Sequence, residues 1–562
     1  MKNKFILTLI FSVFIQLSWA QKHTVGLISA ENSKTFNGYN MLYPHEQPNV
    51  YLLDNCGRIA HIWKDTADSR PGNTVYLLDD GSILKTKRSA KVTGNPIWSG
   101  GGGGTVEKRD WDNKLLWTFT LNDSSNRLHH DIEPMPNGNI LMISWEKKTK
   151  TQAISKGRNP AYLANNEIWP DKIIEVKPVS KDRFIIVWEW HLWDHLVQNF
   201  DSTKPGYGNP KDFPGKIDLN YANLSSAKNW AFLNAISYNY GFDQIVVGSP
   251  SFNEIWVIDH STTTAEAATG NGGFGKKGGD LIYRWGNPAA YNSGTTADQK
   301  LFFPHDIHWM GKNWGDKDFG KLMVFNNRVG SNYSTVNIFQ PTFDTYMWLY
   351  PKNGNKYLPN TFSWTYKRPD STAMYSNGLS SVQRLDNDNT LICSAQDGYT
   401  FEITPTQEIV WEYVTPLKLG VKLKQGDTTL NPADNNTFRV CRYASDHPGF
   451  KGKDLSPKGF IELNPDTFFC ALPLADIKKS ENSVMINIFP NPTDNALHIE
   501  IKNGLIEINS LVLYSITGEI IREAKNLKSP NYTLNLSDVK NGLYFISINK
   551  NQVVKKLEIK HF

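Results

Sequence analysis

Histidine recurs beside aspartate at several points of this 562-residue sequence, each time close to the start of a strand-like phrase. An imidazole can act as a nucleophile, as a proton carrier near neutral pH, or as a metal ligand. An arginine beside such groups would bind a sulfate or a carboxylate through two parallel hydrogen bonds. If corresponding ends of these phrases meet in the fold, four polar clusters come together: His129-His130-Asp131, Asp194-His195, His305-Asp306-Ile307-His308 and Asn327-Arg328.

Three of these histidines are the candidate catalytic residues, namely His130, His195 and His305, because each has an aspartate as its direct neighbour. His129 and His308 are expected to be weaker partners. Three imidazoles with one open coordination position would also suit zinc, which leaves a metal site as an alternative hypothesis. No cofactor is otherwise expected.

Other conspicuous residues have a structural interpretation. His61, His191 and His260 lie within strand phrases next to Trp or Asp, so they are expected to pack. The glycine run 100–104 has neither the following Lys-Ser/Thr nor the spacing of a phosphate loop. It is interpreted as a tight loop or a close backbone approach at the channel.

The clusters need a framework, and residues 22–473 supply one by repeating a phrase of strand, tight turn and strand. Asn-Gly and Asp-Gly favour the turns of hairpins, and the flanking Val, Ile, Tyr and Trp prefer strands. A four-stranded unit that recurs every several tens of residues is typical of a β-propeller, and we predict an all-β, six-bladed β-propeller. The tryptophans are expected to pack between blades, with one helix or turn near 194–200. The clearest copies are Val75–Leu84, Ile132–Leu141 and Val382–Leu391.

The two ends have the composition of targeting segments. Residues 1–20 combine a basic start, an apolar run and the small-x-small pattern Ser18-Trp19-Ala20, which predicts a secretory signal peptide. No later apolar run is long enough for a transmembrane segment. Residues 474–483 are polar and predict a linker, and the alternating short strands of 484–562 predict a small C-terminal β-sandwich.

Charge and cysteine content narrow the possible partners. The formal net charge is only +5, from 60 basic and 55 acidic residues, so nucleic acid is not an expected partner. Four cysteines form no metal-type pair. A disulfide is possible in an exported protein, and Cys441 with Cys470 is the favoured pair.

The C-terminal segment carries three distinctive runs and a basic end; the runs are Phe489–Pro492, Leu513–Glu519 and Asn541–Ile548. This combination resembles the C-terminal sorting domain that exports proteins through the type IX secretion system of Bacteroidota. The resemblance implies passage through the periplasm and outer membrane, a secreted or cell-surface location, and the type IX machinery as partner.

The central section resembles the arylsulfotransferase-like family of secreted β-propellers over roughly Phe36 to Pro473. The runs that carry this resemblance are Tyr51–Trp63, His129–Asn139, Val187–Gln198, Glu254–Thr263, Gly278–Pro288 and Phe325–Arg328. In such sulfotransferases a channel histidine transiently carries the sulfuryl group, while other histidines and an arginine stabilise the sulfate oxygens.

The resemblance also assigns individual residues. His305 matches the histidine that precedes the family's central strand phrase, and Arg328 lies near the expected sulfate-binding arginine. Asn327 and Asn234 are the further substrate-binding candidates it implies. The family's DWxHxN motif is Asn229–Asn234 here, with Phe232 at its histidine position.

The family's nucleophilic histidine is expected late in the propeller. This chain has no histidine between His308 and His447, and the matching segment 375–383 offers only hydroxyl and amide groups.

Two functions follow. The first is transfer of sulfate from an aryl sulfate to a phenol, with an aryl sulfate or another anionic small molecule as ligand. The alternative is a non-catalytic surface propeller that binds a carbohydrate, a phenolic or a protein ligand.

Overall fold

The structure is a computed structural model that describes residues 23–89, 97–163, 166–221, 228–370, 373–467, 470, 486–501, 507–515, 519–549 and 553–561. The predicted signal peptide (1–20) and the predicted linker (474–483) lie outside the described residues.

The body up to residue 470 is all-β, as predicted. Its described part contains six antiparallel sheets of four or five strands. In sheet order, the first three are β33 (Val440–Ala444), β2 (Gly38–Leu42), β3 (Val50–Leu53) and β4 (Ile59–Trp63); β5 (Pro71–Leu77), β6 (Ile83–Arg88), β7 (Gly104–Arg109) and β8 (Leu115–Thr120); and β9 (Asn126–Pro134), β10 (Ile140–Glu146), β13 (Asp171–Ser180) and β14 (Arg183–His191).

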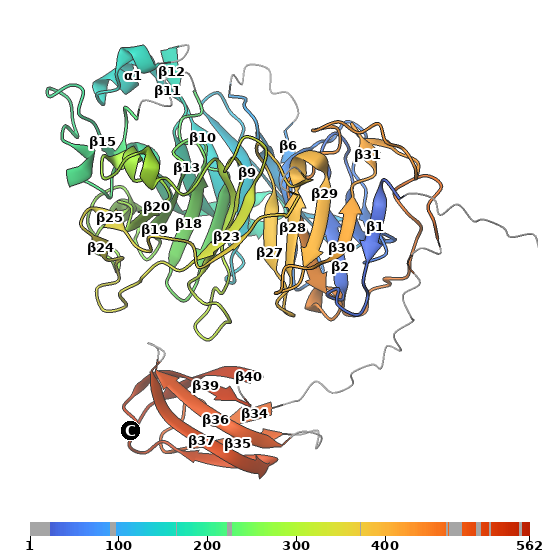
Figure 1. The fold of residues 1–562 in the computed structure, drawn as a ribbon. Coiled ribbons are helices and arrows are strands. Elements are labelled where there is room, and N and C mark those ends of the chain that lie inside the picture. The colour runs from blue at the N-terminus through green and yellow to red at the C-terminus, as the bar shows by residue number, and fades with distance from the viewer. Residues whose placement is uncertain are drawn as a thin grey trace, which may run out of the picture.

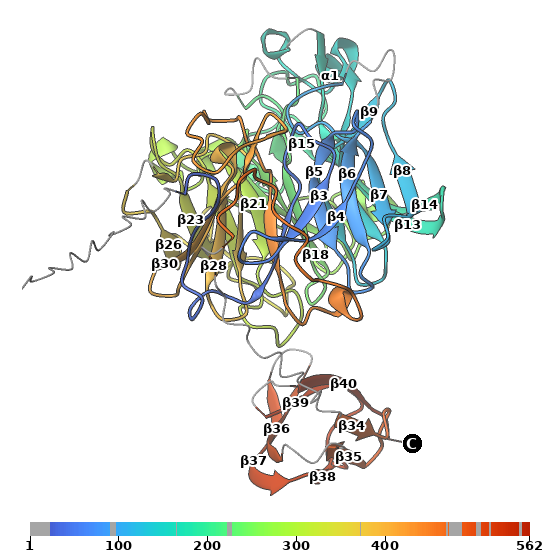
Figure 2. The same ribbon diagram turned by 90° about the vertical axis from the view of Figure 1, so that its right-hand side faces the viewer.

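The other three sheets follow in chain order. They are β17 (Ala235–Asn239), β18 (Gln244–Ser249), β19 (Glu254–Asp259) and β20 (Tyr283–Trp285); β21 (Pro304–Trp309), β22 (Leu322–Asn326), β23 (Thr335–Phe339) and β26 (Trp364–Tyr366); and β27 (Ser381–Arg384), β28 (Thr390–Ser394), β29 (Tyr399–Ile403), β30 (Ile409–Val414) and β1 (Gly26–Ala30). The strands of the last sheet lie side by side in Figure 1, and β5 to β8 lie side by side in Figure 2.

Loops carry short elements. The two α-helices of the described residues are α1 (Lys150–Ser155) and α2 (Thr264–Ala267). The two-stranded ribbons are β11 (Lys148–Thr149) with β12 (Glu167–Ile168), β15 (Leu196–Val197) with β16 (Ile217–Asp218), β24 (Lys352–Asn353) with β25 (Lys356–Tyr357), and β31 (Leu417–Lys418) with β32 (Val421–Lys422).

Each large sheet contacts the next, and in five of these six contacts both strands are edge strands. β5 contacts β9, β9 contacts β17, β17 contacts β21, β21 contacts β27, β27 contacts β33, and β2 contacts β5. We call β5, β9, β17, β21, β27 and β33 the inner strands. The contacts return to their starting point, so the sheets form a propeller-like ring. The two ends of the body close it, because β33 pairs with β2 and β30 pairs with β1.

Local sequence explains the hairpins and the core. The Asn137-Gly138 turn forms as predicted, with Gly138 at φ +83° and its N–H donating to the carbonyl of Met135. The tryptophans of the repeated phrases are buried, as expected for packing. They are Trp63, Trp117, Trp188, Trp190, Trp256, Trp285 and Trp411.

Two local predictions need correction. Cys470 is disulfide-bonded to Cys56, with a Cα–Cα distance of 5.5 Å, and not to Cys441. Cys441 lies in the inner strand β33 and is a free cysteine. The bridge between residue 460 and Arg58 brings the last residues of the body close to Cys56. The helix or turn expected near 194–200 is a single 3₁₀ turn that lies earlier, at Leu192–Asp194, and β15 follows it.

The C-terminal segment forms two sheets. They are β34 (Ile486–Phe489), β35 (Ala496–Ile501) and β38 (Asn531–Asn535), and β37 (Ile520–Ser529), β36 (Ile508–Ser515), β39 (Gly542–Ile548) and β40 (Val553–Ile559). Leu497 and Leu534 of the first sheet share one buried cluster with Leu511 and Ile546 of the second. This is the β-sandwich that the alternating pattern predicts.

Candidate functional site

The inner strands begin with irregular backbone. Residues with positive φ occur there at His130 (+50°), Phe232 (+59°), Asp306 (+52°) and Ser380 (+89°). The pairing register of β9 shifts opposite 129–131, and that of β21 shifts between His305 and 308. Such bulges turn a side chain out of the regular alternation and are common beside functional sites. The two histidine clusters therefore lie at bulges of two inner strands.

His305 is held in a defined tautomer. Its side chain is nearly buried, and its Nδ1 donates to Oδ1 of Asn327 at 2.9 Å and lies 3.2 Å from the carbonyl oxygen of Phe303. The amide nitrogen of Asn327 donates to the carbonyl oxygens of Ser376 and Leu379, so its oxygen must face the imidazole. With the proton on Nδ1, Nε2 of His305 keeps a free lone pair. Burial lowers the pKa of His305 to about 4, so the ring is neutral at pH 7.

Arg328 supplies an exposed cation next to His305. Its guanidinium lies 3.7 Å from the ring centroid of Phe303, and its Nε donates to the carbonyl of Asn377. Among the described residues no partner of Nη1 or Nη2 is found. These two groups can therefore bind the oxygens of a sulfate or carboxylate.

His130 is the end of a chain of three buried polar groups. Its Nδ1 lies 2.8 Å from Nδ1 of His129, and Nε2 of His129 lies 3.0 Å from Oδ1 of Asp171. The ring of His129 also stacks on Trp145, with centroids 4.0 Å apart. Burial lowers the pKa values of both histidines and raises that of the Asp171 carboxyl. Both imidazoles are therefore neutral at pH 7, and burial favours the protonated form of the Asp171 carboxyl.

Three phenylalanines connect the two histidines, and we call them the aromatic collar: Phe232, Phe303 and Phe438. Phe232 meets the ring of His130 edge to face at 4.7 Å and lies 6.3 Å from Phe303. Phe438 lies 6.3 Å from His130 and 6.5 Å from His305, measured between ring centroids. The three rings therefore form an apolar aromatic surface between the two histidines, with the guanidinium of Arg328 on Phe303.

The glycine run approaches His130 closely, as predicted. Gly101 has φ +81°, and a Cβ there would lie 2.1 Å from Nε2 of His130. A side chain at this position would displace the ring, so glycine is required.

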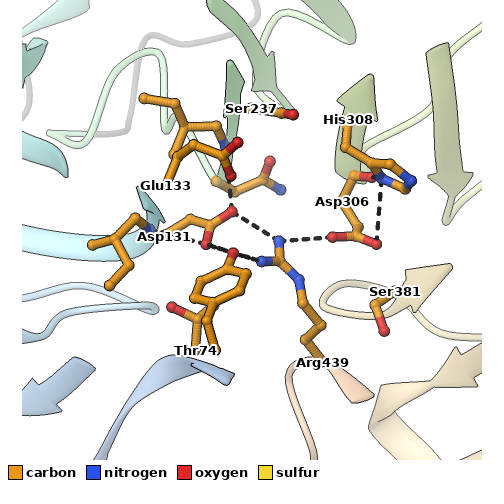
Figure 3. A network of polar contacts seen from close by, with 12 residues as sticks. Thr74, Asp131, Glu133, Ser237, Asp306, His308, Ser381 and Arg439 are labelled. Carbon is orange, nitrogen blue, oxygen red and sulfur yellow. Dashed lines mark hydrogen bonds and ion pairs between the residues drawn. The ribbon is translucent and has the colours of Figure 1, made fainter. Parts of the chain in front are cut away.

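Arg439 fixes the spacing of the two histidine clusters (Figure 3). Asp131 follows His130, Asp306 follows His305, and the guanidinium lies between their carboxylates at 2.8 and 2.7 Å. Burial alone would lower the pKa of Arg439, but the two carboxylates raise it well above its ordinary value. A buried charge pair of this kind is costly to break, so the network ties β9 to β21.

A cavity of about 220 Å³ lies beside Arg439. Its lining includes Glu133, His308 and Lys312, and Lys312 is already paired with Glu133. Nδ1 of His308 lies 2.8 Å from the carbonyl of Asp306. The cavity offers fewer free charged groups than the mouth with Arg328, which is therefore the stronger candidate site.

Two of the residues expected from sequence lie elsewhere or act indirectly. His195 is not part of the cluster, because its ring contacts Asp280 (2.8 Å), the carbonyl of Ala267 (2.8 Å) and Trp190 of the outer strand β14. Asn234 is buried and donates to the carbonyl of Pro304, so it joins β17 to β21 rather than facing an open mouth.

The zinc hypothesis fails for the same reason. It needs His130, His195 and His305 around one ion, and His195 lies at the outer edge of its sheet. Within the described ranges no group of three potential metal ligands is assembled.

Sequence reasoning missed two residues of the site, Asp171 and Arg439, and named His129 only as a weaker partner. His-Asp recurs in β9 and β21, so a cation between two aspartates could have been sought. Arg439 directly precedes the inner strand β33, and this position could have marked it as the cation between the two aspartates. Asp171 begins the third strand of its sheet and gave no comparable signal.

Comparison with protein families gives two matches. A family described as Arylsulfotransferase (ASST) matches residues 23–429. A second, described as Secretion system C-terminal sorting domain, matches residues 487–560. No curated protein sequence matches the chain.

Solved structures resemble the body at low sequence identity. A protein of unknown function from Bacteroides caccae is 11% identical, with 73% of this chain and 99% of that chain covered, at a TM-score of 0.38. A streptogramin B lyase is 13% identical, with 72% and 86% covered, at a TM-score of 0.33. The β-propeller domain of Cps50 (Swd1) from Myceliophteria thermophila is 9% identical, with 71% and 91% covered, at a TM-score of 0.34.

The described residues contain no helix long and apolar enough to cross a membrane.

Proposed function

The chain belongs to the arylsulfotransferase (ASST) family and carries a type IX secretion sorting domain, and from this premise we propose that it transfers sulfate from an aryl sulfate to a phenol. The sorting domain directs the protein across the outer membrane, to the cell surface or outside. We further propose that the six large sheets are the blades of a six-bladed propeller, with the reaction at the mouth where the inner strands begin.

One observation carries the proposal. Nδ1 of His305 is committed to Asn327, so the neutral ring presents an unprotonated Nε2 beside a guanidinium with two free Nη groups. A nucleophile and an oxyanion-binding group are what sulfuryl transfer requires. The aromatic collar accounts for an aryl group on the donor and on the acceptor.

The proposed reaction has two halves. Nε2 of His305 attacks sulfur, the bond between sulfur and the phenolic oxygen breaks, and a phenolate leaves. The sulfuryl group stays on His305, whose Nδ1–H remains hydrogen-bonded to Asn327. Arg328 holds the sulfate oxygens through both halves. An acceptor phenol, deprotonated as it attacks sulfur, then regenerates free His305.

His130 is the proposed acid and base. Its ring and that of His305 lie 6.3 and 6.5 Å from Phe438, and in this proposal His130 donates a proton to the departing phenolic oxygen. Neutral histidines suit this cycle, since a protonated His305 would have no lone pair for attack.

A specific observation supports the alternative function. Phe232 stands where the family's motif has histidine, and the segment 375–383 has no imidazole. The same mouth would then bind an aryl sulfate or another phenolic anion without transferring sulfate. In that case Arg328 and the aromatic collar keep their roles and His305 serves only as a hydrogen-bond acceptor.

The test is an assay of the purified protein with 4-nitrophenyl sulfate as donor and phenol as acceptor. Transfer predicts that release of 4-nitrophenol depends on phenol and that phenyl sulfate is formed. A brief incubation with donor alone should add one sulfuryl group to the peptide that contains His305, as measured by mass spectrometry. Binding without release in calorimetry would support the alternative and overturn the transferase.

A further inference from the structure

Three buried groups stand in line behind the candidate site: Asp171, His129 and His130. The contacts between them are 3.0 Å (Asp171 Oδ1 to His129 Nε2) and 2.8 Å (His129 Nδ1 to His130 Nδ1). Their exposed fractions are 0, 3 and 2%. Nε2 of His129 has only the 3.0 Å contact with Asp171, and Nε2 of His130 has no polar partner among the residues that the structure describes.

We propose that Asp171 and His129 form a proton relay to His130, through which Nε2 of His130 protonates the departing phenolate and deprotonates the incoming phenol. This inference rests on the proposed function, because it assigns proton movements within the same transfer reaction.

The facing Nδ1 atoms determine how the relay works. Two nitrogens 2.8 Å apart share one proton, so one ring donates and the other accepts. If His129 donates, its Nε2 is bare and accepts from a protonated Asp171, while His130 carries its proton on Nε2. If His130 donates, its Nε2 is bare, and Nε2–H of His129 faces an Asp171 carboxylate.

These two arrangements differ by one proton, and it enters or leaves at Nε2 of His130. The first arrangement is uncharged throughout, which the complete burial of the three groups favours in the resting protein. It is therefore an acid with its proton at His130. The second carries one negative charge on Asp171 and is the corresponding base.

The relay balances the proposed reaction. An aryl sulfate monoanion reacts with Nε2 of His305, and the bond between sulfur and the phenolic oxygen breaks. The phenolate takes the proton from Nε2 of His130. A proton moves from Nδ1 of His129 to Nδ1 of His130, and another from Asp171 to Nε2 of His129. The products are a neutral phenol, the sulfuryl-histidine and an Asp171 carboxylate, so the charge of −1 is conserved.

The second half reverses these movements. The hydroxyl proton of the acceptor passes to Nε2 of His130 as its oxygen attacks sulfur, and Asp171 ends protonated again. Neither imidazole becomes an imidazolium at any stage, which matters in a buried site because that cation would be poorly solvated.

Surrounding residues hold the relay in place. The ring of His129 stacks on Trp145, and the backbone N–H of Leu233 donates to Oδ1 of Asp171 at 3.3 Å. His130 is confined between Phe232 and Gly101. Leu233 directly follows Phe232, so the same short segment contacts both ends of the relay.

The decisive variant is Asp171→Asn. An asparagine amide can donate to Nε2 of His129, although it then loses the 3.3 Å bond from the N–H of Leu233, and it cannot release a proton to the relay. The control is Asp280→Asn, which changes the same residue type at another Asp–His contact, that of His195 outside the site.

The readout compares two donors. 4-Nitrophenolate leaves readily without protonation, whereas the more basic phenolate of phenyl sulfate needs a proton as it departs. The first half-reaction is followed as sulfation of His305 in a single turnover. Asp171→Asn should slow it about 100-fold with phenyl sulfate and less than about threefold with 4-nitrophenyl sulfate. Asp280→Asn should change neither rate. An equal loss with both donors, or no loss with either, would overturn the relay.

A second measurement separates this proposal from the transferase itself. If the unaltered protein sulfated His305 from neither donor, the proposed function would be wrong. The relay would then be judged by the ¹⁵N shifts of labelled histidines in the unaltered protein. It predicts a protonated Nδ1 on His129 and a protonated Nε2 on His130. A bare Nε2 on His130 in the resting protein would overturn it.

Discussion

Nδ1 of His305 and Oδ1 of Asn327 lie 2.9 Å apart, and this contact decides which nitrogen of His305 faces the ligand. The amide nitrogen of Asn327 is committed to two backbone carbonyls, so only its oxygen is available to the ring. His305 starts the inner strand β21, and Asn327 directly follows its neighbour β22. The pairing of two adjacent strands thus presents Nε2 as the reactive atom.

His305→Asn should abolish transfer while preserving this contact. The asparagine amide can still donate to Asn327 from the position of Nδ1, but it has no counterpart of Nε2. We expect a loss on the order of 10³-fold in kcat/KM, since the nucleophile is removed. Because His305 is buried, a thermal melt should accompany the kinetics. The matched variant Asn327→Ala should keep Nε2 and lose less, about 10- to 100-fold. Retained activity in His305→Asn would assign the sulfuryl group to another residue.

Arg328 and Phe232 should separate the two ends of the ligand. Arg328→Lys keeps the charge but loses the forked geometry, so affinity for an aryl sulfate should fall about tenfold. Phe232→Ala should weaken binding of an aryl sulfate by a similar factor, since it removes an aromatic wall, and should leave inorganic sulfate unaffected. Isothermal calorimetry with both ligands makes the comparison. If Phe232→Ala weakened both ligands equally, the aromatic collar would not be the aryl site.

Much of the fold could be predicted because the relevant signals are local. Asn137-Gly138 specifies a hairpin through its own backbone preferences, and the Trp-rich strands specify burial by their composition. Residues 305 and 328 of the site were found through motif positions. Asn327 was also named, although its role is to orient His305.

The remaining site residues depend on contacts that no local pattern encodes. Asp171 reaches His129 only because β13 and β9 flank β10 in one sheet. Arg439 meets Asp131 across 308 positions of sequence, which the closing of the ring makes possible. His195 has the same neighbour type as His130, yet its Asp–His pair follows an outer strand. Residue type alone could not distinguish an inner strand from an outer one.

Trp411→Ala should show that the tryptophans hold the body together. Trp411 is 1% exposed, and its Nε1 donates to the carbonyl of Asn55 at 2.7 Å, which ties the last sheet to the first hairpin. We expect a loss of about 3–5 kcal/mol in the free energy of unfolding. Tyr346→Ala is the control, since that side chain is 94% exposed and should change stability by less than about 0.5 kcal/mol. Denaturant unfolding followed by fluorescence measures both, and a small effect at Trp411 would contradict the packing role.

Deletion of 486–562 should stop export. The segment matches the sorting domain over 487–560, and its two sheets share their own core, so its removal should leave the folded body intact. In a type IX-competent host the truncated protein should accumulate in the periplasm, as measured by cell fractionation. Protease accessibility of the full-length protein on intact cells is the control. Surface display of the truncated form would show that the body carries its own export signal.

His260 should make stability fall as the pH rises. Its side chain is 12% exposed, and its ring contacts Oδ1 of Asp243 at 2.7 Å and Oε2 of Glu175 at 2.9 Å. Burial alone would lower the pKa of His260, but hydrogen bonds to the two carboxylates outweigh it and raise the pKa to about 9.

The direction follows from linkage. A pKa raised in the folded state stabilises the protein fully below the unfolded value of about 6.5, and this contribution disappears as the pH approaches 9. It amounts to at most about 3 kcal/mol. Burial alone would lower the pKa of His191, but its contacts with Glu146 and Glu189 raise that pKa to about 9. His191 therefore contributes to stability over the same pH range. The unfolding free energy of His260→Gln should therefore lie furthest below that of the unaltered protein below about pH 6.5. The gap should narrow by pH 9, and the His191→Gln double variant should flatten the remaining dependence. A gap that stayed constant from pH 6.5 to 9 would mean that His260 is neutral in the folded protein.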